Sequence, residues 1–127
     1  MLKVLVVEDD PLNMKLACEI LTAQGFMVHR AKDGVEAIKM TEKEFYDLIL
    51  MDIALPDMDG IEATRIIKNK LQYADVPVIA LTAYAMKGDK ERILKAGLSD
   101  YIPKPIEVSN FMERMERYMK LEKANNN

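Results

Sequence analysis

Three runs of the sequence are continuously apolar, and they constrain the fold more than any other feature. They occupy residues 4–7, 48–51 and 78–81. A strand with one exposed face alternates apolar and polar residues, whereas a strand of a parallel sheet that is covered on both faces is apolar throughout. Two further segments, 28–31 and 101–102, bring the expected strands to five, and His29 and Arg30 place the second strand at an edge of the sheet.

Longer amphipathic segments separate these runs and predict five helices. Asp10 is the expected N-cap of the first helix, with Pro11 at its first position. The second starts near Asp33, the third follows Gly60, and the fourth is expected over residues 84–95. The inward-facing residues expected in the first, second, third and fifth helices are Leu12, Leu16, Ile20 and Leu21; Val35 and Ile38; Ile66 and Ile67; and Val108, Phe111, Met112, Met115, Tyr118 and Met119.

Strict alternation of five strands and five helices predicts an α/β, doubly wound (βα)5 domain. Right-handed crossovers place a parallel five-stranded sheet between two layers of helices, as a three-layer sandwich. The 127 residues are the length of one domain, and no linker or repeat divides them. We expect residues 1–122 to form this domain and the polar residues 123–127 to be a disordered tail. Ligands of such sheets bind at the carboxyl ends of the strands.

Acidic residues gather where two of these strands end. Glu8, Asp9 and Asp10 follow the first apolar run, and Asp52 closes the third. Neighbouring strands lie about 5 Å apart, so these carboxylates would converge if the two strands are adjacent. Asp10 is explained as a helix cap, whereas Asp52 is followed by residues 53–56 and has no helix to cap. Converging carboxylates repel one another, and a hard divalent cation with oxygen ligands would relieve the repulsion.

A hydroxyl and an ammonium are expected at the same edge. Thr82 follows the fourth run, and Lys104 follows the fifth. Together with Asp52, a metal and these two donors would neutralise the charge that develops in phosphoryl transfer. Aspartate can also be the nucleophile and form an acyl phosphate. The pattern therefore indicates a phosphoryl-accepting site.

The sequence resembles the receiver domain of response regulators in two-component systems. The resemblance covers essentially the whole chain and rests on Val6-Val7-Glu8-Asp9-Asp10, Leu50-Met51-Asp52-Ile53, Leu55-Pro56-Asp57-Met58-Asp59-Gly60, Leu81-Thr82-Ala83 and Lys104-Pro105. It implies a flavodoxin-like fold with strand order 2-1-3-4-5. It also implies a cis Lys104–Pro105 peptide bond.

The resemblance assigns a role to each matching position. Asp52 would be the phosphoacceptor. Mg²⁺, for which Mn²⁺ can substitute, would be held by Asp9, Asp52 and the backbone carbonyl of Ala54, and by Glu8 through a water. Thr82 and Lys104 would bind phosphoryl oxygens, and Tyr101 would be the aromatic switch. Glu8 stands where the family more often has aspartate. Tyr84 is bulky and could slow dephosphorylation by shielding the phosphoryl group.

The resemblance also implies partners and an output. The phosphoryl group would come from a sensor histidine kinase or a histidine phosphotransfer protein, and a downstream protein would bind the face of the fourth helix, fifth strand and fifth helix. Asn13, Met14 and Ala17 are the expected kinase-docking residues. The domain would assist its own phosphorylation and dephosphorylation without being a conventional enzyme. We expect a monomer. The start at Met1 and the short polar end favour a complete single-domain regulator over a receiver excised from a longer one.

Composition limits the remaining possibilities. A net charge of −3 argues against nucleic-acid binding, and no segment has the roughly 20 apolar residues of a membrane span. The single cysteine, Cys18, fits a reducing cytoplasm, where we expect the protein to lie. Cys18 is expected to be inert filler and His29 a surface residue.

Three alternative functions are considered. The segment 57–60 matches the D-x-D-G motif of haloacid dehalogenase-type phosphatases, but it does not close a strand near the start of the domain. A flavin-binding flavodoxin would need a phosphate-binding loop after the first strand, and none is found. A receiver-like module that no longer accepts phosphate remains the main alternative, and the presence of Asp9, Asp52, Thr82 and Lys104 together argues against it.

Overall fold

The computed structural model describes residues 1–83 and 87–125. Strands and helices alternate along the chain in the predicted way, with one short 3-10 helix, η1, before the fourth strand. The elements are β1 (Lys3–Val7), α1 (Pro11–Ala23), β2 (Met27–Ala31), α2 (Gly34–Lys43), β3 (Leu48–Asp52), α3 (Gly60–Lys68), η1 (Leu71–Tyr73), β4 (Val78–Thr82), α4 (Lys87–Lys95), β5 (Asp100–Pro103) and α5 (Val108–Asn125).

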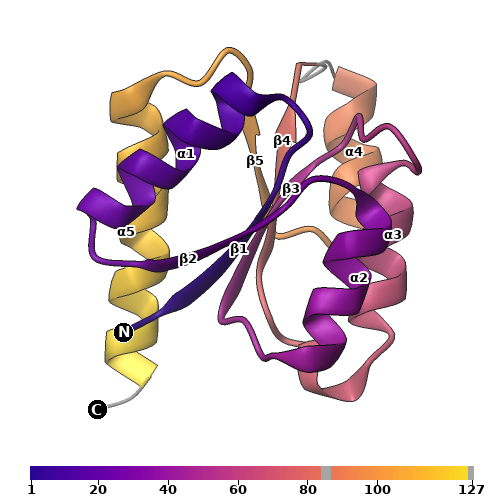
Figure 1. Cartoon of the computed structure of the whole chain (residues 1–127), viewed down its shortest axis with the longest axis horizontal. Coiled ribbons are helices and arrows are strands. Elements are labelled where there is room, and N and C mark those ends of the chain that lie inside the picture. The colour runs from indigo at the N-terminus through magenta and orange to yellow at the C-terminus, as the bar shows by residue number, and fades with distance from the viewer. Residues whose placement is uncertain (84–86, 126–127) are drawn as a thin grey trace.

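The five strands form one parallel sheet in the order β2-β1-β3-β4-β5. Helices α1 and α5 cover one face, and α2, α3 and α4 cover the other (Figure 1). The central strands β3 and β4 are buried at every position, which explains their continuous apolar sequence. The more polar β2 is at an edge. The predicted fold class and strand order are therefore confirmed.

Each face of the sheet has its own hydrophobic core. Phe111 and Met115 of α5 pack with α1 residues such as Leu21 against one face. Ile67 of α3 and Ile93 of α4 pack against the other. The predicted cap Asp10 is present, and the side chains of Asp33 and Asp59, which were not predicted as caps, likewise accept a backbone hydrogen bond at the start of a helix.

Three residues that were expected to face inward are instead exposed. Leu12 is 77% exposed, and Val35 and Val108 are each 44% exposed. All three lie in the first turn of a helix, just after the chain has left the carboxyl edge of the sheet, so no strand lies beneath them. On α1 the buried positions include Met14, Ala17, Ile20 and Leu21, while Leu16 is partly buried.

Ile66 and Met112 were also wrongly placed in the core, being 39% and 40% exposed. Each is next in sequence to a fully buried residue, and neighbouring helical positions point about 100° apart, so only one of the two can face the sheet. The fourth helix begins at Lys87 in the described residues, and the expected start at Tyr84 lies outside them. Helix α5 continues to Asn125, so residues 123–125 are helical rather than a disordered tail.

Candidate functional site

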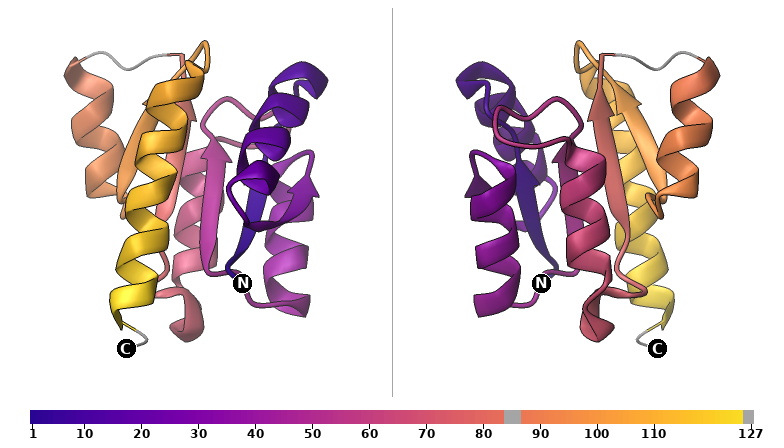
Figure 2. Two further views of the ribbon diagram at one scale, coloured as in Figure 1. Left: turned by 90° about the vertical axis from the view of Figure 1, so that its left-hand side faces the viewer. Right: turned by 90° about the vertical axis from the view of Figure 1, so that its right-hand side faces the viewer.

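The carboxyl ends of the strands lie at one edge of the sheet (Figure 2). The predicted site residues end or directly follow these strands. Across the sheet, the register pairs Val7 with Met51, Asp52 with Leu81, and Thr82 with Pro103. Glu8 follows β1 directly, so it lies beside Asp52 at the end of β3. The amide of Lys104 donates to the carbonyl oxygen of Thr82 at 2.9 Å, which carries the strand pairing on to Lys104. Neighbouring strands of one sheet thus build the site.

Lys104 is at the centre of this cluster. Its Nζ lies 3.0 Å from Oδ2 of Asp52 and 3.0 Å from Oε2 of Glu8, and it donates a hydrogen bond to Oε1 of Glu8 at 3.2 Å. The side chain of Glu8 is completely buried and that of Asp52 is 3% exposed. Thr82 is 2% exposed and also has an interaction partner. The ammonium therefore joins two carboxylates that would otherwise repel each other.

The pKa of Glu8 shows how unfavourable its negative charge is. Burial raises this pKa from 4.5 to about 7, and the neighbouring charge of Asp52 adds to the rise, while hydrogen bonding to Lys104 opposes it. Burial by itself would lower the pKa of Lys104, but its bonds to Glu8 and Asp52 outweigh burial and raise the pKa. The site thus holds one firmly charged ammonium and more carboxylate than the ammonium can neutralise.

The donor set suits a magnesium ion. Carboxylate oxygens of Glu8, Asp9 and Asp52 all lie within 4.8 Å of one another. Although Oε2 of Glu8 is close to Lys104, it accepts no hydrogen bond from any residue that the structure describes, even though it is buried. Asp9 is exposed, so the cluster is reachable from solvent. Hard oxygen donors at one open edge are the ligands that Mg²⁺ prefers.

The β3–α3 loop, residues 53–59, closes over the end of β3. The amide of Ala54 donates to Oδ1 of Asp52 at 3.0 Å, and the amide of Gly60 donates to the carbonyl oxygen of Ile53 at 2.8 Å. Gly60 must be glycine, because a Cβ there would lie 2.1 Å from the carbonyl oxygen of Asp52. The loop that carries Ala54 is therefore pressed against the backbone of Asp52. The Lys104–Pro105 peptide bond is cis, as the resemblance implied.

Tyr101, the expected switch residue, is partly buried on β5. Nζ of Lys90 on α4 lies 5.9 Å from its ring centre, and the guanidinium of Arg114 on α5 lies 5.7 Å from it. Arg114 is itself held by Oδ1 of Asp100 at 2.7 Å and by the carbonyl oxygen of Tyr101 at 3.0 Å. The ring thus contacts charged groups of both α4 and α5, and these contacts join the three elements of the expected output face.

Comparison with known proteins identifies the family. A family model described as the response regulator receiver domain matches residues 4–116. The chain belongs to the response regulator receiver domains. The polar-differentiation response regulator DivK of Brucella ovis is 45% identical over 116 residues, which span 91% of this receiver domain and 94% of the relative. Receiver domains of this family are phosphoacceptor switches in two-component signalling.

Solved structures agree with this assignment. The receiver domain resembles the chemotaxis protein CheY4 of Vibrio cholerae with a TM-score of 0.88 and 27% identity, covering 93% of this chain and 98% of that one. It resembles the receiver domain of the sensor histidine kinase PA1611 from Pseudomonas aeruginosa PAO1 with a TM-score of 0.85 and 39% identity, covering 94% and 98%. The PA1611 structure has a magnesium ion coordinated in its active-site cleft.

Two of the three residues expected to dock the kinase are buried in the structure. Ala17 is completely buried and Met14 is 9% exposed, because both belong to the stripe of α1 that packs against the sheet. The amide nitrogen of the Asn13 side chain lies 3.5 Å from Oε1 of Glu8, so Asn13 is part of the acidic cluster of the receiver domain. The exposed residues of this helix end include Leu12 and Lys15.

The sequence did not reveal the contacts that tie the β3–α3 loop to helices α2 and α4. Oδ1 and Oδ2 of Asp57 accept hydrogen bonds from the amides of Gly34 and Val35, each at 2.9 Å. Arg92 of α4 lies 3.3 Å from Oδ2 of Asp59. No local sequence pattern pointed to these contacts, because Gly34 is 23 residues from Asp57 and Arg92 is 33 residues from Asp59.

His29 and Cys18 lie apart from the acidic cluster. Nδ1 of His29 is 2.9 Å from the hydroxyl of Tyr46 and 3.1 Å from Oε2 of Glu44, so this partly exposed histidine has polar partners. Cys18 is 3% exposed and packs in the α1–α5 core, as a filler residue would. Among residues 1–83 and 87–125, no helix combines the length and apolar character that crossing a membrane requires.

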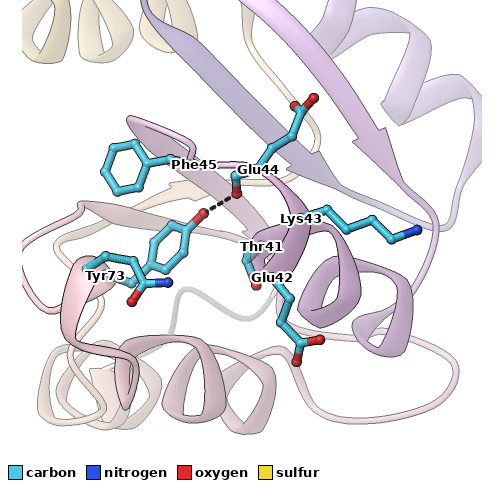
Figure 3. A pocket seen from close by; sticks show the side chains of 7 residues that line it. Thr41, Glu42, Lys43, Glu44, Phe45 and Tyr73 are labelled. Atoms are coloured by element: carbon cyan, nitrogen blue, oxygen red, sulfur yellow. Dashed lines mark hydrogen bonds between the residues drawn. The ribbon is translucent and has the colours of Figure 1, made fainter.

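A pocket of about 160 Å³ lies at the other end of the sheet (Figure 3). It lies between the end of α2 and η1, where the hydroxyl of Tyr73 donates to the carbonyl oxygen of Glu44 at 2.8 Å. Phe45 stacks on Tyr73 with ring centres 5.3 Å apart. The lining carries charges of both signs, from Glu42, Glu44 and Lys43, and none of the predicted site residues. This pocket is therefore separate from the acidic cluster.

Proposed function

We propose that the domain accepts a phosphoryl group from a phosphohistidine onto Asp52 and switches the binding of a downstream protein. The donor is a sensor histidine kinase or a histidine phosphotransfer protein. The observation that carries this proposal is the contact of Lys104 Nζ with both Asp52 and Glu8, each at 3.0 Å, at an edge where three carboxylates converge. A buried, closely paired set of charges is typical of a site that meets a charged reactant.

The chemistry is the transfer of one phosphoryl group. A carboxylate oxygen of Asp52 forms a bond to phosphorus as the phosphorus–nitrogen bond to the donor histidine breaks, and the imidazole leaves with that electron pair. Lys104 already contacts Asp52 and would bind one phosphoryl oxygen. The hydroxyl of Thr82, at the end of the neighbouring strand, would bind another. Lys104 would neutralise charge on the transferred group and Thr82 would donate a hydrogen bond to it, and the domain is a switch rather than a turnover enzyme.

The proposed ligands of Mg²⁺ are Glu8, Asp9, Asp52 and the backbone carbonyl of Ala54. Mn²⁺ can substitute for Mg²⁺ at this site. When bound, the ion would supply positive charge beside the attacking carboxylate and the phosphoryl oxygens. The support in this chain is the oxygen-only donor set within 4.8 Å and the buried Glu8. The magnesium ion in the cleft of the PA1611 receiver domain gives the same indication for a relative.

Phosphorylation would be read out at the face formed by α4, β5 and α5. Movement of Thr82 toward the phosphoryl group would leave space for Tyr101 to turn inward, away from Lys90 and Arg114. Lys90 and Arg114 would then both lose their contact with the Tyr101 ring. The shape of the face and the placement of its charges would change. Phosphorylation would thus shift an existing equilibrium of this face toward the form that the downstream protein binds. The proposed effect of Tyr84 on phosphate lifetime concerns a residue outside the described ones.

The kinase or phosphotransfer protein is proposed to dock on the exposed end of α1. Leu12 is 77% exposed there, directly after the acidic residues of the site. An exposed leucine beside a charged cleft gives a partner helix an apolar contact next to its phosphohistidine. The monomeric state and the cytoplasmic location remain part of this proposal.

Intact mass after incubation with acetyl phosphate and MgCl₂ tests the central step. We expect the wild-type mass to rise by one phosphoryl group and Asp52→Asn to show no rise. The control is Asp10→Asn, which changes a neighbouring acid that caps α1 and leaves Asp52 in place. A wild-type protein that gains no mass would favour the alternative of an interaction module that does not accept phosphate. A gain that survives Asp52→Asn would reject Asp52 as the acceptor.

A further inference from the structure

The position of the Ala54 carbonyl depends on the path of the β3–α3 loop. A side-chain ligand can adjust by rotating about its χ angles, whereas a backbone carbonyl can be moved only by moving the chain. Ala54, Pro56 and Asp57 are exposed, while Leu55 between them is partly buried and packs against the core. The amide of Ala54 is bonded to Asp52 at one end of this segment, so the other end, at Asp57, needs an attachment of its own to fix the path of the chain.

Asp57 provides a fixed point. Its two carboxylate oxygens accept one hydrogen bond each, at 2.9 Å, from the amides of Gly34 and Val35. These amides belong to the first turn of α2, whose donors have no partner within the helix. Asp33, the N-cap, serves a different amide, that of Glu36, at 2.8 Å. Asp57 is thus a second, long-range cap that ties the loop to α2 through two bonds.

The surroundings fit the two-bond contact. Gly34 has no side chain at the point where the loop approaches, and a Cβ there would lie 2.5 Å from Cγ of Met58 and 3.4 Å from Oδ1 of Asp57. The amide of Gly34 is the main reason that the pKa of Asp57 is lowered, so the carboxylate form is favoured. Bonds from backbone amides to a carboxylate are stronger than bonds between neutral groups.

We propose that Asp57 is a positioning residue for the metal site: by clamping the β3–α3 loop to the start of α2, it holds the carbonyl of Ala54 where Mg²⁺ needs a ligand. Asp57 touches neither the metal nor the phosphoryl group in this scheme. The inference rests on the proposed function, because it requires that Mg²⁺ bind at Glu8, Asp9 and Asp52. It extends the site to a helix that carries none of the expected ligands.

Titration of the amide NMR signals with MgCl₂ tests the inference without any phosphorylation. Asp57→Ala should raise the dissociation constant for Mg²⁺ by at least about threefold, on the order of the tenfold effects seen for outer-shell partners of metal ligands. The amide signals of Gly34 and Val35 should shift upfield in the same variant, because they lose their acceptor. Asp57→Asn keeps one acceptor oxygen and should bind Mg²⁺ with an affinity between those of Asp57→Ala and the wild type.

Asp33→Ala is the matched control, since it removes a carboxylate from the same helix end without releasing the loop. It should bind Mg²⁺ within about threefold of the wild type. Equal weakening in Asp33→Ala and Asp57→Ala would overturn the inference in favour of helix fraying. If Asp57→Asn and Asp57→Ala weaken Mg²⁺ binding equally, the inference is overturned, because loss of the charge alone explains the effect. If Asp57→Ala raises the dissociation constant for Mg²⁺ less than threefold, the inference is also overturned. A wild-type protein that binds no Mg²⁺ would instead reject the metal site of the proposed function.

Discussion

At the scale of single residues, the complete burial of the Glu8 side chain was not predicted. Sequence reasoning placed it beside Asp52, but its complete burial and its orphaned oxygen follow only from the packing around it. A buried carboxylate with a raised pKa favours the folded state only while it is protonated. Without a metal, this residue therefore makes the domain sensitive to pH.

The unfolding free energy of the metal-free domain should fall as the pH rises. The folded pKa of Glu8 is about 7, above its ordinary 4.5, so its contribution is complete below pH 4.5 and is lost as the pH rises through about 7. The loss should be on the order of 1 to 3 kcal/mol relative to Glu8→Gln, whose side chain does not titrate. Urea unfolding in EDTA at several pH values measures it. A difference between the two proteins that does not change with pH would contradict the prediction.

At the scale of elements, the β3–α3 connection is the most constrained segment near the site. Its ends are joined by the bond from Gly60 to Ile53, its acid Asp59 caps α3, and Asp57 reaches α2. The third helix was expected to follow Gly60, and α3 does start at this position. The close approach of Gly60 to the backbone of Asp52 was not recognised, because it depends on how α3 packs against the end of β3.

Gly60→Ala should destabilise the domain by roughly 1 to 3 kcal/mol, the usual cost of overpacking. The added Cβ would lie 2.1 Å from the carbonyl oxygen of Asp52, and neither backbone segment can yield without moving the loop or β3. Chemical denaturation measures the effect. Glu62→Ala, in the first turn of the same helix and exposed, is the control and should change stability little. Equal stability of Gly60→Ala and the wild type would show that the approach is looser than described.

At the scale of the whole molecule, the site joins strands that are far apart in the sequence. Lys104 meets Glu8 across 96 residues, and this contact requires β1, β3, β4 and β5 to assemble in register. A ligand that binds this edge therefore binds only the folded protein, and its binding free energy adds to the stability of the whole domain.

Removal of Mg²⁺ should lower the melting temperature for this reason. At a Mg²⁺ concentration about 100 times its dissociation constant, binding adds about 2.7 kcal/mol to the free energy of unfolding. For a domain of this size, that increase raises the melting temperature by on the order of 10 °C. Calorimetric scans in MgCl₂ and in EDTA measure the shift. Asp52→Asn, which removes one proposed ligand, should shift less than the wild type at the same concentration. A melting temperature that is the same in both solutions would contradict the proposed metal site.

The sequence by itself determined the fold class, the edge position of β2 and the residues at the ends of the strands, which are Glu8, Asp9, Asp52, Thr82 and Lys104, because strand burial depends on local pattern. Only the tertiary structure decided that Leu12, Val35 and Val108 are exposed, that Met14 and Ala17 are buried, and that Asp57 caps α2. The physical reason is that burial at a helix end and hydrogen bonds between distant segments depend on where the sheet stops and which loop reaches it. Local periodicity carries no information on either.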